Sequence, residues 1–322
     1  MPTPKLFWPI KVGTSSLQHR VVLAPLTRVR SSRKGHVPTL PLMETSYGQR
    51  SSRPGKAGGL DNVPGIWNQD QIDAWKKITE RVHMNGSFIY LQLWAFGRAE
   101  TPKVMREDGY DLVAPSPIPM SRIRRVEVHC ANGYLIDLFL QDLGNQRTDE
   151  YGGSVEARSK FPLQVIDAIV KAIGEERTGL RISPFSTFQG MKMKDPVPQF
   201  THFIKSLVTA YPDMAYLHTV EPDNGVTTES SDFLPGSFTM QSAVERAEAT
   251  GDLIAFGRWY ISNPDLPTRI EKNIPLTPFN RKTFYTPAHV EGTEKGYIDY
   301  PFADSDIKAA EHSVQSNATF DF

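Results

Sequence analysis

The chain has 322 residues, and its 36 Lys and Arg balance its 36 Asp and Glu, so the formal net charge is zero. This balance argues against nucleic acid or an anionic membrane as the main partner. The only cysteine, Cys130, excludes an internal disulfide and a Cys-rich zinc site, as expected in a reducing compartment.

The N-terminal part of the chain lacks the apolar run of a signal peptide. No later segment approaches the roughly 18 uninterrupted apolar residues of a membrane span, so we expect a soluble, cytoplasmic protein. Residues 6–17 suggest a small N-terminal segment that covers part of the fold. Residues 20–26 predict a strand that ends around Pro25, with Thr27 where the strand meets its loop, and residues 38–50 predict a helix.

Helix and strand signals then alternate. Apolar residues at helical spacing predict a helix over residues 69–84, with Asn68 as its N-cap. Residues 87–94 predict a buried strand with one polar interior residue, Gln92. Residues 97–125 contain four prolines and no apolar periodicity, which indicates one long loop.

A dense polar pattern follows. A short apolar strand over residues 126–128 leads into His129, and Asn132 and Tyr134 come within five residues. His and Asn can both donate hydrogen bonds to one carbonyl oxygen whose negative charge grows during a reaction. The phenol of Tyr134 can act as a general acid. Taken singly, such residues are more often a satisfied histidine, a turn-forming asparagine and a packed tyrosine.

The remainder of the chain repeats strand, loop and helix. Helices are predicted over residues 161–173, 198–210 and 240–250, and strands over residues 179–184, 214–220 and 252–256. This alternation indicates a parallel α/β fold.

The H-x-x-N-x-Y pattern is part of a longer motif that continues with Arg147, Asp149, Tyr151, Gly152, Gly153 and Arg158. This motif resembles the old yellow enzyme family of FMN-dependent ene-reductases, and the resemblance extends over most of the chain. It implies one (β/α)8 TIM-barrel domain over residues 1–322. Three stretches, at residues 65–68, 149–154 and 258–267, look most like the fungal branch that includes ergot-alkaloid and other secondary-metabolite enzymes. A natural-product enone or enal is the implied substrate class.

Compared with that family, the chain lacks three stretches: the second barrel strand after residues 53–55, the helix before Val126, and most of the seventh strand after Asp232. A closed barrel needs a consistent strand number, tilt and shear. An incomplete or distorted barrel is therefore expected. Three explanations stay open: neighbouring segments substitute, the barrel is broken, or the sequence comes from a shortened transcript or gene model.

The resemblance implies an FMN site at the carboxyl ends of the strands. The residues that match cofactor-binding positions are Pro25, Thr27, Gly58, Gln92, Arg181, Gly236, Ser237, Gly257 and Arg258. Substrate-binding positions are matched by His129, Asn132, Trp94 and Tyr285, and Tyr134 matches the proton donor. Singly, a buried Thr or Gln usually only packs, and Gly-Arg after a strand is commonly a turn. Cys130 occupies a variable spacer position.

The implied reaction has two half-reactions in one site: NADPH reduces FMN, and an α,β-unsaturated carbonyl compound is then reduced while Tyr134 protonates its α-carbon. The sequence has no separate G-x-G-x-x-G motif, in agreement with a shared site. We expect a small-molecule partner, no nucleic acid or membrane partner, and a monomer or homodimer. Two alternatives remain, a flavin-independent isomerase or cyclase that uses the same acid site and a non-catalytic remnant.

Overall fold

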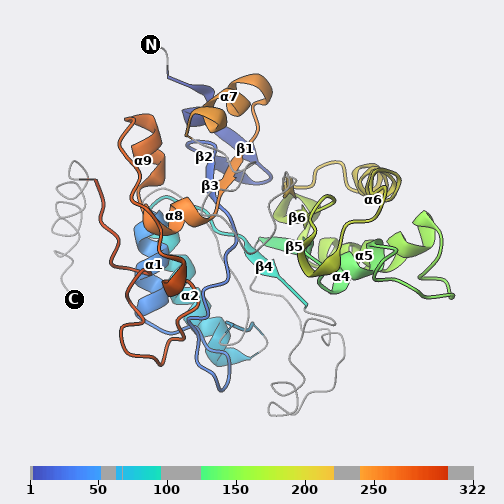
Figure 1. Ribbon diagram of the computed structural model, residues 1–322, viewed down its shortest axis with the longest axis horizontal. Helices are drawn as coiled ribbons and strands as arrows, with labels where there is room; N and C mark the ends of the chain where they lie inside the picture. Colours follow the sequence, from blue (N-terminus) through green and yellow to red (C-terminus); the bar gives the residue numbers. More distant parts are fainter. Residues whose placement is uncertain (1–2, 52–62, 67, 96–124, 221–239, 304–322) are drawn as a thin grey trace. The chain divides into compact units, whose positions relative to one another are not determined.

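The computed structural model describes residues 3–51, 63–66, 68–95, 125–220 and 240–303 (Figure 1). The chain forms two compact units. The first unit comprises Met1–Pro9, Leu17–Ile89 and Met240–Phe322, and the second comprises Ile10–Ser16 and Tyr90–Thr239. Each unit is described by itself. That residues 1–322 form a single domain stays a prediction.

Within its described residues, the first unit contains one pair of parallel strands and the helices around it. Its strands are β3 (Val21–Leu23) and β8 (Ile254–Phe256), which pair in parallel. Its helices are η1 (Lys5–Phe7), α1 (Leu42–Ser51), α2 (Gln69–Met84), α7 (Met240–Thr250), α8 (Arg258–Ser262), α9 (Leu266–Glu271) and η5 (Arg281–Thr283). The predicted helix over residues 69–84 is confirmed with its N-cap: Gln71 N donates to Asn68 Oδ1 over 3.0 Å, and Asn68 N donates to Gln71 Oε1 over 3.2 Å.

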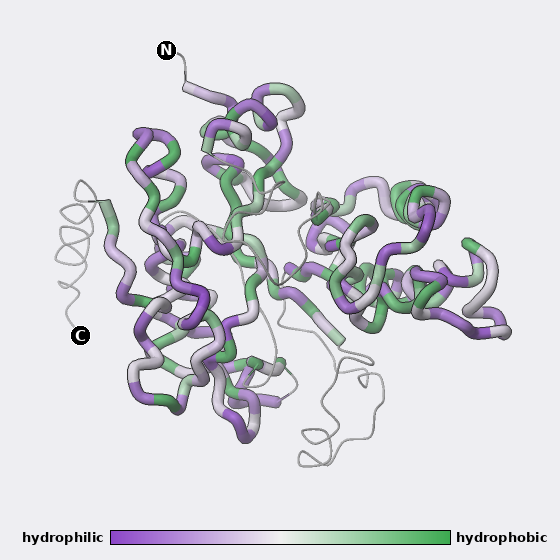
Figure 2. The backbone as a smooth tube through the Cα atoms, in the orientation of Figure 1, coloured by the Kyte–Doolittle hydropathy of each residue, from purple (hydrophilic) through white to green (hydrophobic). Residues whose placement is uncertain are grey.

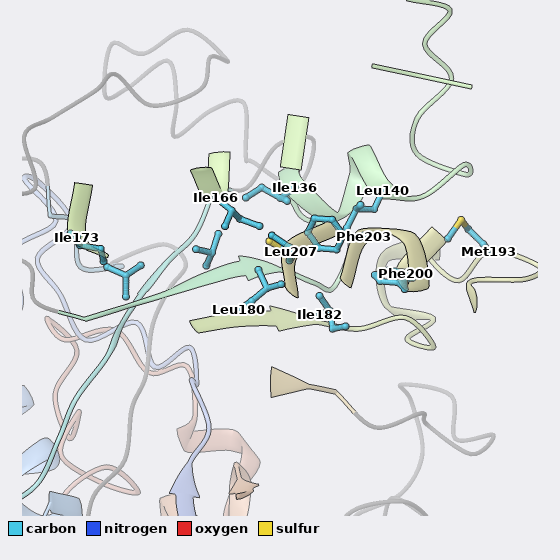
Figure 3. Packing of buried hydrophobic residues seen from close by; sticks show 13 residues of the cluster. Ile136, Leu140, Ile166, Ile173, Leu180, Ile182, Met193, Phe200, Phe203 and Leu207 are labelled. Carbon is cyan, nitrogen blue, oxygen red and sulfur yellow. The ribbon is translucent and has the colours of Figure 1, made fainter. Parts of the chain in front are cut away.

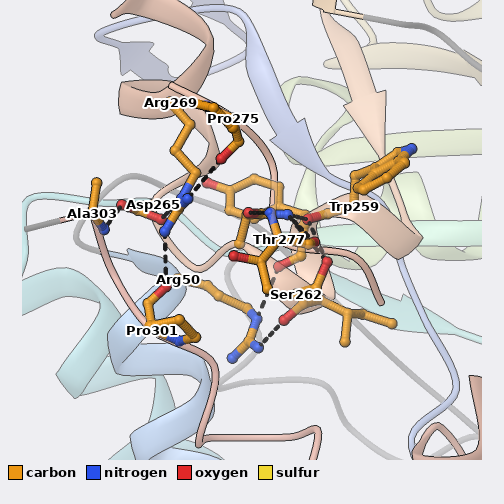
Figure 4. A network of polar contacts seen from close by, with 12 residues as sticks. Arg50, Trp259, Ser262, Asp265, Arg269, Pro275, Thr277, Pro301 and Ala303 are labelled. Atoms are coloured by element: carbon orange, nitrogen blue, oxygen red, sulfur yellow. Dashed lines mark hydrogen bonds and ion pairs between the residues drawn. The ribbon is translucent and has the colours of Figure 1, made fainter. Parts of the chain in front are cut away.

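Buried polar contacts hold the C-terminal segment of the first unit to its helices (Figure 4). The guanidinium of Arg50, on α1, donates to the carbonyls of Tyr260 and Ile261. Arg269 pairs with Asp265 over 2.7 Å, and both side chains are buried. Because the remaining polar atoms of this pair also find backbone partners, its burial leaves few groups unsatisfied.

The second unit is built on a parallel four-stranded sheet in the order β4-β5-β6-β7. These strands are β4 (Leu91–Leu93), β5 (Val126–Cys130), β6 (Thr178–Ile182) and β7 (Tyr216–Thr219). The connecting helices are α4 (Leu135–Leu140), α5 (Val155–Ile173), η3 (Glu175–Arg177), η4 (Phe188–Gly190) and α6 (Val197–Ala210). Near the N-terminus, β1 (Ile10–Val12) pairs with β2 (Ser15–Leu17).

One face of this sheet is apolar and covered by helices. Val126, Val128 and Cys130 of β5 pack with Leu180 and Ile182 of β6 in a buried cluster, and α4, α5 and α6 supply the opposing side chains (Figure 3). Along these helices the hydropathy changes every few residues, as amphipathic helices require (Figure 2). Alternate residues of a strand point to opposite faces, so the intervening residues form a second face.

The second face is polar. The register aligns Gln92 of β4 with Glu127 of β5, and it aligns His129 of β5 with Arg181 of β6 and His218 of β7. These side chains, together with Tyr216, are called the polar face. It holds three of the second unit's candidate site residues, Gln92, His129 and Arg181.

The strand pairing follows the order of a barrel with two positions unfilled. In a (β/α)8 barrel each strand pairs with its neighbours in chain order and the last pairs with the first. Here β8 pairs with β3, and β4 to β7 pair in succession. Within the described ranges no strand stands between β3 and β4 or between β7 and β8, where the sequence predicts missing strands. The predicted long loop over residues 97–125 lies almost wholly outside the described residues.

Several predicted boundaries were wrong by a few residues. The first strand ends at Leu23, and the helix predicted over residues 38–50 begins at Leu42. The helix predicted from Phe161 begins at Val155, because the side chain of Ser154 caps it by accepting from Ala157 N. No helix among the described residues has the length and apolar character needed to cross a membrane.

Candidate active site

The H-x-x-N-x-Y segment forms a tight turn between β5 and α4. Asn132 and Gly133 both adopt left-handed backbone conformations, with φ of 59° and 73°, and Tyr134 is the N-cap of α4. A Cβ atom at Gly133 would lie 2.8 Å from Cγ of Met191. Glycine is therefore required at this position for both its conformation and its space.

Three side chains hold this turn, and two of them, Asp137 and Ser183, are buried. Gly133 N donates to Asp137 Oδ2 over 2.8 Å, and Asn132 N donates to Ser183 Oγ over 2.7 Å. The Gln189 amide donates to the carbonyl of Asn132 over 2.9 Å. Burial raises the pKa of the Asp137 carboxyl to about 6, although its bonds from Gly133 and Gln141 favour the ionised form. The side-chain amide of Asn132 makes no hydrogen bond within the described part of the chain and is available to a ligand.

The structure brings Trp94, His129 and Tyr134 together. The rings of Trp94 and His129 are stacked, with centroids 5.4 Å apart and planes 13° apart. The ring of Tyr134 stands edge-on to both, at 4.4 Å from Trp94 and 5.2 Å from His129. These contacts fix the orientation of all three rings beside the end of β5.

His129 is a neutral hydrogen-bond donor in this environment. Burial, and next to it the neighbouring Arg181 guanidinium, lower the pKa of its imidazole to about 3. Ala131 N donates to His129 Nδ1 over 3.3 Å. Because Nδ1 accepts, the single proton of the neutral ring belongs on Nε2. The Nε2–H group can therefore donate to a substrate oxygen at any pH near neutrality.

Glu127 connects the strands of the polar face. Its Oε1 accepts from the Gln92 amide over 2.7 Å, its Oε2 lies 3.2 Å from His218 Nδ1, and Tyr216 is also hydrogen-bonded to it. The side chain is 2% exposed. Glu127, Tyr216 and His218 were not predicted from the sequence. The available signal was a lone acid in an otherwise apolar strand, two residues before His129 and therefore on the same face.

Arg181 and Gln92 present groups that fit a flavin. Nε of Arg181 is buried and has no hydrogen-bond partner among the described residues. Burial lowers the pKa of this guanidinium, and the Glu127 carboxylate opposes the shift. The Gln92 amide nitrogen faces Glu127, and within the described ranges its oxygen accepts no hydrogen bond. A buried N–H donor and an amide acceptor complement the pyrimidine edge of a flavin, which offers carbonyl oxygens and an N–H group.

The first unit holds the other described candidates. Pro25 and Thr27 follow β3, and Gly257 and Arg258 follow β8. A Cβ atom at Gly257 would lie 3.3 Å from Cδ2 of Leu26, so the loops after these paired strands are adjacent. Tyr285 is 59% exposed and contacts Phe284. Gly58, Gly236 and Ser237 lie outside the described residues.

Cys130 lies on the apolar face of the sheet. Its side chain is fully buried, and burial raises the pKa of the thiol well above its ordinary value. A buried, protonated thiol is a poor nucleophile. This environment is that of a packed spacer residue.

Parallel strands with polar side chains at their carboxyl ends are the arrangement of barrel enzymes. The model of the NADH:flavin oxidoreductase / NADH oxidase family matches residues 5–120 and 121–277, which is most of the chain. The chain therefore belongs to this family of flavin oxidoreductases.

Individual relatives agree with this assignment. The chain is 41% identical over 372 residues to the chanoclavine-I aldehyde reductase of Penicillium roqueforti, with 95% of this chain and 99% of that protein covered. It is 38% identical over 378 residues to a probable inactive reductase of Epichloe festucae var. lolii, with 95% and 97% covered. The solved structure of an old yellow enzyme homologue from Zymomonas mobilis is 33% identical, with a TM-score of 0.80 over 93% of this chain and all of that one.

These findings confirm the predicted old yellow enzyme type, its fungal branch and its barrel fold. Both alignments to the fungal relatives are longer than the 322 residues of this chain. The relatives therefore contain residues that this chain lacks, in agreement with the predicted internal deletions.

Proposed function

We propose that this chain is an FMN-dependent, NADPH-consuming ene-reductase that reduces the C=C bond of an α,β-unsaturated carbonyl compound in fungal secondary metabolism. The observation that carries the proposal is the arrangement at the end of β5. There a neutral His129 with its proton on Nε2 contacts Tyr134 and Trp94, and it lies on the same sheet face as Arg181.

The residues expected to hold FMN are Pro25, Thr27, Gln92, Arg181, Gly257 and Arg258, together with Gly58, Gly236 and Ser237. When bound, FMN supplies the hydride chemistry of the two half-reactions. Arg181 would place a half-buried cation where negative charge collects on the flavin, and the Gln92 oxygen could accept a hydrogen bond from the ring edge.

His129 and Asn132 are proposed to bind the substrate carbonyl oxygen. A neutral imidazole with its proton on Nε2 donates one hydrogen bond, and the Asn132 amide, which makes no other bond among the described residues, donates a second. Two donors on one oxygen draw electron density away from the β-carbon and stabilise the charge that develops on the oxygen. Trp94 lies beside His129. Tyr285 stays a predicted substrate-binding residue.

Tyr134 is proposed to deliver the proton to the α-carbon. Its ring is held edge-on by Trp94 and His129, so the hydroxyl keeps a constant position relative to the carbonyl donors. A proton donor here favours reduction over isomerisation. The name of the Penicillium roqueforti relative, an aldehyde reductase, supports an enal as substrate.

The test is the Tyr134→Phe variant, followed in separate anaerobic half-reactions. The account predicts slower reoxidation by an enone or enal and an unchanged rate of flavin reduction by NADPH. An equal loss in both half-reactions would contradict the acid role of Tyr134.

A second candidate is a flavin-independent isomerase or cyclase, or a non-catalytic remnant. The two barrel positions at which the described residues contain no strand favour it. So does the name of the Epichloe relative, a probable inactive reductase. Failure of the purified, folded protein to take up FMN would support this candidate.

A further inference from the structure

Glu127 is a buried carboxylate that the proposed chemistry does not use directly. It lies in the middle of β5, is 2% exposed, and faces the polar side of the sheet two residues before His129. Burying a charge without partners is costly, so a carboxylate kept here needs a compensating environment.

Residues of two other strands form that environment. Gln92 comes from β4, and Tyr216 and His218 come from β7, across the intervening strand β6. The ring of Tyr216 reaches Glu127 because residue 179 on β6 is glycine: a Cβ atom there would overlap the ring. Tyr90 packs edge-on against Tyr216 with centroids 5.1 Å apart. The amide and the phenol can both donate, which suits an ionised carboxylate because it only accepts.

Glu127 also acts on the cation of the same face. Arg181 forms no ion pair among the described residues, and the Glu127 carboxylate is the nearby negative charge that favours its protonated form. His129 is neutral. Arg125 stands at the other end of β5, where it donates to Thr14. The electrostatic potential beside His129 is therefore set mainly by the positive charge of Arg181. The negative charge of Glu127 opposes it.

We propose that Glu127 tunes the reduction potential of the bound flavin, as a positioning residue that partly cancels the charge of Arg181 and orients the amide of Gln92. This inference rests on the proposed function, because it requires that FMN binds against the polar face. Reduction adds negative charge to the flavin; Arg181 favours that charge and Glu127 opposes it. Glu127 thereby keeps the flavin a strong enough reductant to pass its hydride on to the substrate.

Removal of the Glu127 charge should make the reduction potential of the flavin more positive. Replacing Glu127 by glutamine removes the negative charge but keeps the size of the side chain and an oxygen that can accept. A unit charge at about 10 Å in an effective dielectric of about 20 changes an equilibrium constant roughly tenfold or somewhat more. For a two-electron couple, tenfold corresponds to about 30 mV. The Glu127→Gln flavoprotein should have a midpoint potential about 30 mV more positive than the wild type.

The experiment is an anaerobic dye-equilibrium titration of the FMN-loaded proteins at pH 8. The matched control is Glu156→Gln, which removes an exposed carboxylate on α5 of the same unit and should leave the potential unchanged. A merely structural role for Glu127 predicts weaker FMN binding without the positive shift. An unchanged or more negative potential in Glu127→Gln overturns the inference.

A second variant tests the inference if Glu127→Gln does not fold. Tyr216→Phe removes one donor to Glu127 but keeps the carboxylate, so its negative charge is less compensated and the potential should become more negative. An unchanged or more positive potential in Tyr216→Phe overturns the inference. A wild-type protein that takes up no FMN overturns the proposed function together with this inference, whereas a flavin-loaded wild type with insensitive variants overturns this inference alone.

Discussion

Replacement of Asp137 tests whether a buried carboxylate holds the H-x-x-N-x-Y turn. The side chain is fully buried on α4 and accepts from Gly133 N and from the Gln141 amide. Burial raises its pKa from 3.8 to about 6. A pKa shift of roughly two units corresponds to about 3 kcal/mol. Ionisation of Asp137 lowers the unfolding free energy by this amount.

The sign of the pH dependence is unusual for a carboxylate. The folded protein binds the Asp137 proton more tightly than the unfolded chain does, so the stability contributed by this group is present below about pH 4. It is lost as the pH rises through about 6. Asp137→Asn removes this dependence but keeps an oxygen for the Gly133 N–H group.

Urea unfolding of the wild type and of Asp137→Asn at pH 5 and pH 7.5 measures this effect. The difference in unfolding free energy, variant minus wild type, should increase by about 1 to 2 kcal/mol between the two pH values, since part of the titration lies below pH 5. Asp137→Ala should be about 1–3 kcal/mol less stable than Asp137→Asn at both pH values, because it leaves buried hydrogen-bond donors without an acceptor. A difference that stays constant or falls with rising pH would refute the reasoning.

Three further outcomes are expected. Gly133→Ala should lower the unfolding free energy by about 1–3 kcal/mol in urea titrations, because of its left-handed backbone and the nearby Met191; a neutral result would contradict the tight-turn geometry. Gly179→Ala should displace the Tyr216 ring, and it should lower both the stability and the FMN affinity measured by fluorescence quenching. The control Gly153→Ala has open space at its Cβ position and should leave FMN affinity unchanged. The His129 imidazole should not titrate between pH 5 and 8 in NMR spectra, since its pKa is lowered to about 3; a midpoint near 6.5 would disprove the neutral-donor assignment.

Local signals in the sequence were sufficient for the elements with strong periodicity. The helix over residues 69–84 and its Asn68 cap were predicted to the residue, because apolar spacing and a capping box are both local. The six-residue helix α4 was not predicted, since L-I-D-L-F-L is too short to show a helical period. Its position depends on the turn at Gly133, whose N–H group donates to Asp137.

The candidate site was predicted unevenly for a similar reason. His129 and Tyr134 lie close in sequence, so their motif could be recognised locally, and the structure brings them together with Trp94. Glu127, Tyr216 and His218 could not be recognised, because their contacts depend on the register of separate strands. An isolated buried acid becomes interpretable only when Gln92 is known to lie opposite it.

The most direct test of the account is the visible absorption spectrum of the purified protein, recorded anaerobically before and after NADPH and again after an enal. The account predicts a yellow protein with a flavin spectrum that NADPH bleaches and the enal restores. A folded, colourless protein that cannot be reconstituted with FMN would contradict it.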